Sequence, residues 1–416
     1  MRTLFSTAVL IAAVVGCTGT ATESAHVYTT AESPSPAGPG SAQPNLFSAP
    51  DGRVVMSWQE RVDSNTYALR LALRSEDGSW GETREVMRRS DLFVNWADFP
   101  SVVLLSDGRL VAHWLQRNGG GRYAYEVRMA ESRDAGATWS ESRTPHPAGV
   151  EAEHGFASIL PTEAGAQVFF LDGGNNLAAA SGHKHGEPAG NDNHSTPMTL
   201  SANVWSAAMT PTSKQVVDTR VCDCCQTSAA MTSQGPVVVF RDRSETEIRD
   251  IAISRFVEGA WTASAPVHAD NWEVNFCPVN GPMVQAYGDT VAVAWFTGAR
   301  DTAKVQVAFS YDAGATFGAP MRVDDGNPAG RVGLQLFDGG AYVSWLERGE
   351  GDAAFVKLRR VERDGTRDSS LVVSQSMGAR SSGFPRMTRL RDGLLLVWTE
   401  PGTPSVVKAA TYRRSE

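Results

Sequence analysis

Short apolar runs, most of them ending in an aromatic residue, recur along the chain with a period of roughly fifty residues. In the runs Asp51 to Trp58 and Asp107 to Trp114, an Asp-Gly pair precedes the apolar residues. Further runs cover residues 166–170, 236–240, 290–295, 340–345 and 393–398. Asp-Gly before an apolar run is a strong hairpin signal, and similarity at such a period is typical of repeat folds. The pattern therefore predicts repeated β-hairpins.

Each run has apolar neighbours that can pair with it, such as 101–105 before the second run and 125–130 after it. A four-stranded meander of this kind is the blade of a β-propeller, and one blade alone cannot cover both of its apolar faces. Seven runs predict an all-β, seven-bladed propeller over residues 44–416, with six blades and one irregular repeat as the alternative. A short strand near 26–30 is expected to close the ring, because closure removes sheet edges.

Two segments share the pattern S-x-D-x-G-x-T-W/F, namely Ser132 to Trp139 and Ser310 to Phe317. The carboxylates of Asp134 and Asp312 can accept hydrogen bonds from turn N–H groups, and the glycine can adopt the positive φ of the turn. We therefore assign both aspartates to folding. The pattern is the Asp box, and on these residues the chain resembles the sialidase-like Asp-box (BNR repeat) propellers. The resemblance implies a ligand site at the mouth of the central channel.

Sialidases use a tyrosine nucleophile assisted by a glutamate, with an aspartate as acid/base. By the resemblance, Tyr125 with Glu126, and Asp98 as acid/base, are the catalytic candidates. The F/Y-R-I-P motif of sialidases is absent, and Gln43 to Leu46 stands in its place. We therefore expect a propeller that binds or hydrolyses an anionic glycan, with an adhesion or assembly scaffold without chemistry as an alternative.

Several arginines fall in loops that the propeller order brings to the channel mouth. A guanidinium pairs bidentately with a carboxylate, so clustered arginines suit an anionic ligand, as the three arginines of sialidases do. Ion pairing with neighbouring acids is the alternative role. The candidate ligand-binding arginines are Arg117, Arg122, Arg241, Arg243, Arg300 and Arg386.

Four of the five cysteines open two adjacent repeats: Cys222, Cys224 and Cys225 precede one, and Cys277 precedes the next. Disulfides are the first expectation in an exported protein. The alternatives are redox chemistry and a thiolate metal site that also uses His154, for which Cu or Zn is the suitable ion.

The N-terminus reads as a secretory signal over residues 1–16, with Arg2 followed by a short apolar run. The run ends before Cys17 in a segment that resembles a bacterial lipobox, which implies cleavage there and acylation of Cys17. An ordinary secretory signal is the alternative. Residues 17–43 are rich in small residues and proline, which predicts a flexible tether. We expect an exported, lipid-anchored protein in the periplasm or at the cell surface, touching the membrane through its anchor only.

Composition narrows the expected partners. The formal net charge is −8 and no basic stripe occurs, which argues against a nucleic-acid partner. A hydrophobic content of 42% is sufficient for a large core. The expected partner is a glycan or another anionic small ligand, and the protein is expected to be monomeric.

Overall fold

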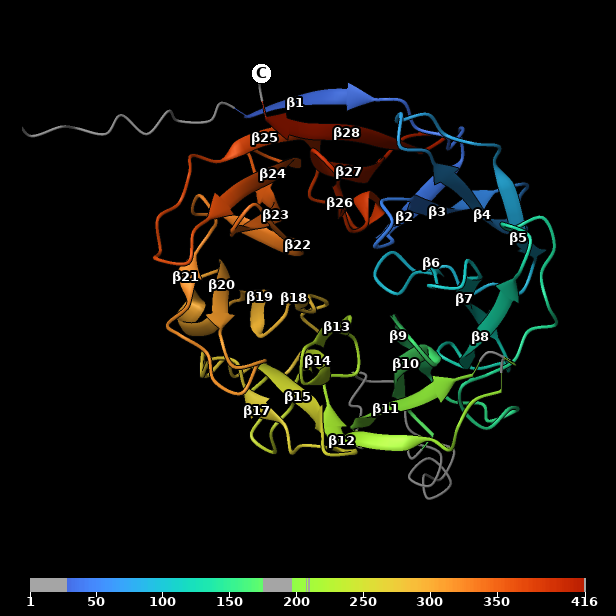
Figure 1. Ribbon diagram of the computed structural model, residues 1–416, viewed down its shortest axis with the longest axis horizontal. Coiled ribbons are helices and arrows are strands. Elements are labelled where there is room, and N and C mark those ends of the chain that lie inside the picture. Colours follow the sequence, from blue (N-terminus) through green and yellow to red (C-terminus); the bar gives the residue numbers. More distant parts are fainter. Residues whose placement is uncertain (1–27, 175–196, 207, 209, 415–416) are drawn as a thin grey trace, which may run out of the picture.

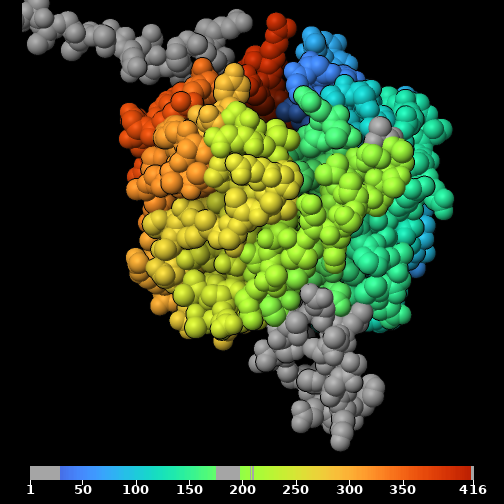
Figure 2. Space-filling view, turned by 60° about the horizontal axis from the view of Figure 1, so that its bottom comes forward, coloured from blue at the N-terminus to red at the C-terminus, as the bar shows by residue number. Residues whose placement is uncertain are grey.

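The computed structural model describes residues 28–174, 197–206, 208 and 210–414. In these residues seven small antiparallel sheets surround one axis, which confirms the seven-bladed propeller (Figure 1). Blades 3, 4 and 5 follow one another round the side of the molecule in chain order (Figure 2). Among all the residues that the structure describes, no helix is long and apolar enough to cross a membrane.

Within each blade the strands run from the axis outward in chain order. Blade 1 has β2 (Ser41–Ser48), β3 (Val54–Arg61), β4 (Tyr67–Arg74) and β5 (Arg84–Arg89). Blade 2 has β6 (Ser101–Leu104), β7 (Leu110–Arg117) and β8 (Tyr125–Ser132). Blade 3 has β9 (His154–Thr162), β10 (Gly165–Asp172), β11 (Met198–Trp205) and β12 (Gln215–Val221). Blade 4 has β13 (Ser228–Thr232), β14 (Gly235–Arg241), β15 (Ile251–Val257), β16 (Ala260–Trp261) and β17 (Ala265–Pro266).

The remaining blades follow the same order. Blade 5 has β18 (Met283–Tyr287), β19 (Thr290–Thr297), β20 (Lys304–Ser310) and β21 (Met321–Arg322). Blade 6 has β22 (Pro328–Phe337), β23 (Gly340–Arg348), β24 (Ala353–Val361) and β25 (Leu371–Met377). Blade 7 has β26 (Arg386–Leu390), β27 (Gly393–Glu400) and β28 (Val406–Arg414). Two single 3₁₀ turns, η1 (Ala299–Asp301) and η2 (Arg380–Ser382), lie in connecting loops.

The ring is closed by an N-terminal strand, β1 (Tyr28–Ser33), which forms the outer edge of blade 7. It runs antiparallel to β28, with Tyr28 opposite Arg414 and Ser33 opposite Ala409. The closing strand predicted near residues 26–30 is therefore found, slightly further along the chain. It lies within the segment 17–43 expected as tether, so the ordered propeller begins at Tyr28 rather than at residue 44.

The core consists of apolar layers between neighbouring blades. The tryptophans of the second strands anchor these layers, and Trp58, Trp295 and Trp345 are completely buried. Trp295, for example, packs with residues of blade 4 such as Val239 and Ile253. Each large apolar side chain buried in this way contributes about 1.5–3 kcal/mol, so the blades are stable only as a stack.

Both Asp boxes form the same turn, at the ends of β8 and β20. In the first, Asp134 Oδ1 accepts the Thr138 N–H at 2.9 Å and Oδ2 accepts its hydroxyl at 2.6 Å. Asp312 makes the same two bonds with Thr316, again at 2.9 and 2.6 Å. Gly136 has the expected positive φ of 92°. These aspartates hold turns, as expected from the sequence.

We predict that closure by β1 contributes measurably to stability. A chain lacking residues 1–33 is compared with one that lacks only residues 1–27 and so keeps the strand. Removing β1 exposes the edge of β28, and the loss should exceed about 2 kcal/mol, or roughly 2–3 °C in Tm for a chain of this length. Thermal unfolding followed by circular dichroism measures this difference, and equal Tm values for the two chains would contradict it.

Candidate functional site

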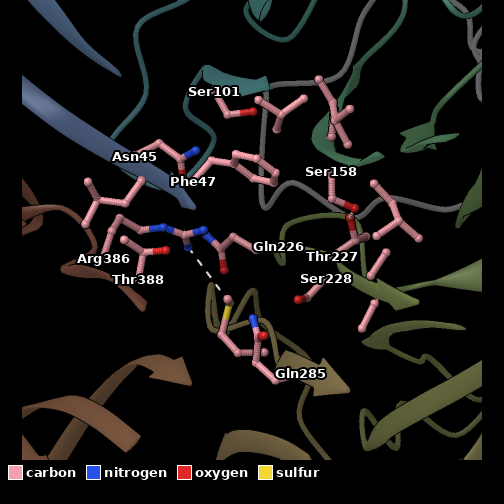
Figure 3. Close-up of a pocket in the computed structure, with 18 of the residues that line it drawn as sticks. Asn45, Phe47, Ser101, Ser158, Gln226, Thr227, Ser228, Gln285, Arg386 and Thr388 are labelled. Atoms are coloured by element: carbon pink, nitrogen blue, oxygen red, sulfur yellow. Dashed lines mark hydrogen bonds between the residues drawn. The ribbon is translucent and has the colours of Figure 1, made fainter. Parts of the chain in front are cut away.

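A cavity of about 470 Å³ lies in the central channel. Every blade lines it through its innermost strand: the seven contributors include Asn45, Ser101, Ser158, Ser228, Met283, Gln335 and Thr388. The volume falls within the range of ~300–1,000 Å³ that is typical of small-molecule sites. Figure 3 shows Asn45, Ser101, Ser158, Ser228 and Thr388 around the cavity, on strands from separate parts of the chain.

The wall of the cavity combines apolar side chains, among them the aromatic ring of Phe47, with hydroxyl and amide groups (Figure 3). Hydroxyls join neighbouring blades: Ser158 Oγ lies 2.9 Å from Thr227 Oγ1, and Thr388 donates to Ser48 Oγ at 2.9 Å. A wall of neutral donors and acceptors can hydrogen-bond a ligand that carries many hydroxyls.

Arg386, at the start of β26, is the cation of the cavity (Figure 3). One guanidinium nitrogen lies 3.9 Å from Met283 Sδ, and the group lies over the Phe99 ring at 5.4 Å. No carboxylate oxygen of the described residues lies within 4.0 Å of it. Burial lowers the pKa of Arg386 to about 10, so it stays protonated at neutral pH. An uncompensated positive charge therefore faces the cavity.

A cluster of two carboxyls and a phenol adjoins the mouth of the cavity. The Tyr125 hydroxyl lies 3.0 Å from Asp98 Oδ2 and 2.9 Å from Glu153 Oε1, and Asp98 Oδ1 accepts the Phe156 N–H at 2.9 Å. Gly155 permits this approach, since a Cβ there would lie 2.1 Å from Asp98 Oδ2. A phenol has one proton, so its second contact requires a protonated carboxyl that donates to the phenol oxygen.

The protonation of this cluster is set by burial. Burial raises the pKa of Asp98 to about 7 and that of Glu153 to about 8, and raises the pKa of Tyr125 well above 10. Of the three, Asp98 lines the cavity. A carboxyl with a pKa near neutrality beside a cavity is suited to general acid/base catalysis.

Tyr125 occupies a supporting position in this cluster. Its side chain is 1% exposed and its ring stacks on Phe93 with centroids 3.9 Å apart. A nucleophilic phenolate needs access and a lowered pKa, and Tyr125 has neither. It orients the carboxyls of Asp98 and Glu153.

Glu126 does not join Tyr125, which corrects the predicted pair. The two residues are neighbours on β8, and successive side chains of a strand point to opposite faces. Glu126 instead forms an ion pair with Arg128 at 3.0 Å. Glu153 from blade 3 takes the expected place, and its position just before an innermost strand was the signal that could have identified it.

Two of the six candidate arginines are structural, which corrects their predicted ligand role. Arg241 donates to the backbone carbonyls of Asn280, Arg249 and Phe296, and so joins blades 4 and 5. Arg243 forms ion pairs with Asp223 at 2.9 Å and with Glu247 at 2.8 Å.

Three other arginines are exposed and lie outside the cavity lining: Arg117 at the end of β7, and Arg122 and Arg300 in connecting loops. Arg117 lies over the Phe93 ring at 5.1 Å, and Arg122 lies over Tyr123 at 5.4 Å. Of the six, Arg386 is therefore the one in the cavity wall.

The four described cysteines gather at one place but are free thiols, so the expected disulfides are not formed. Cys222 Sγ lies 3.7 Å from Cys224 Sγ and 3.6 Å from Cys225 Sγ. Cys277, in the loop before blade 5, is close enough to Cys224 to contribute, after burial, to raising the pKa of that thiol.

His154 lies apart from the thiol group, contrary to expectation. Its ring stacks on His146 with centroids 3.8 Å apart, and its Nε2 lies 3.3 Å from Asp172 Oδ1. Asp172 stands opposite His154 in the pairing of β9 with β10, which holds the imidazole inside blade 3. Cys17, the expected lipidation site, lies outside the described residues.

The fold and this site define a seven-bladed β-propeller with a ligand-sized cavity in its channel. No protein-family model matches the sequence, and no curated protein matches it. Similar solved structures include sialidases and polysaccharide lyases. Their sequence identities to this chain are low, so the likeness is one of fold.

Three of these structures span most of the chain. The alignment with an ulvan lyase covers 89% of this chain and 93% of the lyase chain, with 11% identity and a TM-score of 0.54. The phage phi92 endosialidase covers 94% and 70%, with 10% identity and a TM-score of 0.50. The Hadza microbial sialidase Hz136 covers 84% and 74%, with 13% identity and a TM-score of 0.50.

We predict that Asp98 makes the protein less stable as pH rises. Its pKa is raised from 3.8 to about 7, so its stabilising contribution is complete below about pH 4 and is lost as pH rises through 7. Asp98→Asn keeps an acceptor for Phe156 and a donor for Tyr125 but does not titrate. It should gain about 1–3 kcal/mol over the unmodified chain between pH 5 and pH 8.

Urea unfolding at the two pH values measures this effect. Asp134→Asn is the matched control, because hydrogen bonds from Thr138 hold the pKa of Asp134 at about 2 and it stays ionised at both pH values. Parallel stability profiles for Asp98→Asn and the unmodified chain would show that the carboxyl is not perturbed.

Proposed function

We propose that this protein binds an anionic glycan in the central cavity and that Arg386 holds a carboxylate or sulfate of the sugar. The observation that carries the proposal is the positive charge of Arg386, which faces the cavity beside the thioether of Met283 and the aromatic ring of Phe99. A desolvated charge without a counter-ion is costly. An anionic ligand would provide that counter-ion and gain a bidentate contact.

The rest of the wall supports a sugar as the ligand. Amide and hydroxyl side chains such as Asn45, Gln285 and Thr388 match the hydroxyls of a sugar ring, and Phe47 offers an apolar face. One of the similar structures, the ulvan lyase, was solved bound to -[GlcA(1-4)Rha3S]-, an acidic saccharide. Export through the N-terminal signal expected from the sequence would bring this cavity to extracellular polysaccharides.

A second candidate function, cleavage of the bound glycan, is favoured by Asp98. This carboxyl lines the same cavity and has a pKa of about 7, so it can release or accept a proton near neutral pH. Tyr125 and Glu153 would hold its proton in place. A glycan hydrolase or lyase is therefore the catalytic form of the same proposal.

We predict that Arg386→Met weakens binding of acidic oligosaccharides at least tenfold, because it removes the charge and keeps a side chain of similar length. Calorimetric titration of glucuronate-containing, sulfated and sialylated oligosaccharides, each with its neutral counterpart, measures the effect. Arg386→Lys should retain part of the affinity. The matched control is Arg117→Met, which removes an exposed arginine outside the cavity lining.

Two results would contradict binding through Arg386. Neutral and acidic oligosaccharides that bind equally well would show that charge has no part in recognition. Unchanged affinity in an Arg386→Met chain with an unaltered Tm would show that the ligand lies elsewhere.

For cleavage, we predict that Asp98→Asn abolishes turnover of any glycan that the protein binds and leaves its affinity within a factor of three. Release of reducing ends or of unsaturated sugars measures turnover, and calorimetry measures binding. Unreduced turnover in Asp98→Asn would exclude Asp98 as acid/base. Binding without turnover in the unmodified chain would leave the protein a glycan-binding propeller.

A further inference from the structure

The loop that joins β12 to β13 brings three thiols together at the channel mouth. Their sulfur atoms, from Cys222, Cys224 and Cys225, all lie within 4.8 Å of one another. The corresponding loop of blade 5 brings Cys277 near Cys224, although Cys277 is not one of the three sulfurs that all lie within 4.8 Å of one another. Three thiols of one loop and a fourth cysteine from the next blade therefore lie at the junction of blades 4 and 5.

The spacing of these sulfurs fits a metal ion better than a covalent bond. A disulfide needs sulfurs ~2.05 Å apart, whereas Cys222 Sγ lies 3.7 and 3.6 Å from its two neighbours. Four thiolates at ~2.3 Å from one tetrahedral ion are separated by ~3.8 Å. The observed separations are close to the edge of that tetrahedron.

The surroundings of the thiols include one cation that can stabilise a thiolate at Cys222. A guanidinium nitrogen of Arg249 donates to Cys222 Sγ at 3.4 Å, and Glu247 fixes Arg249 through contacts of 3.0 and 2.7 Å. The backbone N–H of Cys222 donates to the Arg241 carbonyl at 2.9 Å. Partners that orient a ligand in this way are a regular feature of metal sites.

The intervening Asp223 does not compete for the same position. Its Oδ1 accepts the Met198 N–H at 3.0 Å and its Oδ2 pairs with Arg243 at 2.9 Å. The Asp223 carboxylate thereby ties the loop to β11 of blade 3. The residues on either side of it, Cys222 and Cys224, place their sulfur atoms in the thiol group.

We propose that Cys222, Cys224 and Cys225, completed by Cys277, bind one thiophilic metal ion with a filled d shell, Zn²⁺ or Cu⁺. Both ions accept thiolate ligands readily. The ion would join the loop that precedes β13 of blade 4 to the loop that precedes β18 of blade 5. It would also fix Gln226, the next residue, whose amide donates to Ala97 O at 2.5 Å and accepts the Gly281 N–H at 2.9 Å across the channel mouth.

The test uses the full chain, isolated and reduced without oxygen, then supplied with Zn²⁺ or Cu⁺ and freed of excess metal. We expect about one ion per chain by elemental analysis, and a sulfur shell at ~2.3 Å by X-ray absorption. Cys225→Ser should lower the bound metal at least tenfold. Gln226→Ala, the neighbouring residue that offers no thiol, is the matched control and should retain the metal.

Cys277→Ser provides a second variant, because Cys277 is exposed and its replacement should not disturb folding. It should weaken the metal at least tenfold in competition with a chelator. The proposal is overturned if the reduced chain takes up neither ion. It is also overturned if Cys225→Ser binds as much metal as the unmodified chain. These results are independent of glycan binding, which the Arg386 variants test.

Discussion

The antiparallel pairing of β1 with β28 is the constraint on which the rest of the structure depends. It fixes the first blade against the last, and two further contacts cross the same seam: the Gln43 N–H donates to Thr399 Oγ1 at 3.1 Å, and the Thr388 hydroxyl donates to Ser48 at 2.9 Å. Because the ring is closed, all seven innermost strands share one axis, and residues from the whole length of the chain can line one cavity. An open stack would have two exposed edges and no enclosed channel.

Closure also brings ionisable groups of different blades to one cavity without pairing them. Within one blade, acids and bases reach each other and pair, as Arg109 and Glu131 do at 2.6 Å in blade 2. Arg386, of blade 7, and Asp98, in the loop before blade 2, both line this cavity, and no ion pair joins them. The ring can therefore hold a cation and an uncharged, protonated carboxyl in one cavity, which is the condition for a site that both attracts an anion and moves a proton.

The fold could be predicted from the sequence because its signals are local. The repeat of apolar runs and Asp-Gly turns gave the blade number, and the two Asp boxes predicted their own hydrogen bonds. The site depends on contacts between blades that local patterns do not reveal. Tyr125 meets Glu153 rather than its neighbour Glu126 because alternation on β8 separates adjacent side chains. Arg241 is occupied by carbonyls of Asn280 and Phe296, which lie in the next blade.

Arg331 and Arg386 show that the hydrogen-bond partners of an arginine, rather than its residue type, identify the ligand site. Burial lowers the pKa of both Arg331 and Arg386 to about 10. Arg331, on β22, donates to Ser382 Oγ at 2.5 Å and to the Gly383 and Ala379 carbonyls at 2.8 and 2.9 Å. Its hydrogen bonds are met by the protein itself, so it stabilises the join between blades 6 and 7. Arg386 has a sulfur atom and the face of Phe99 in place of such oxygens. A guanidinium is thus structural in one blade and, in the next, open to an anion that enters the channel.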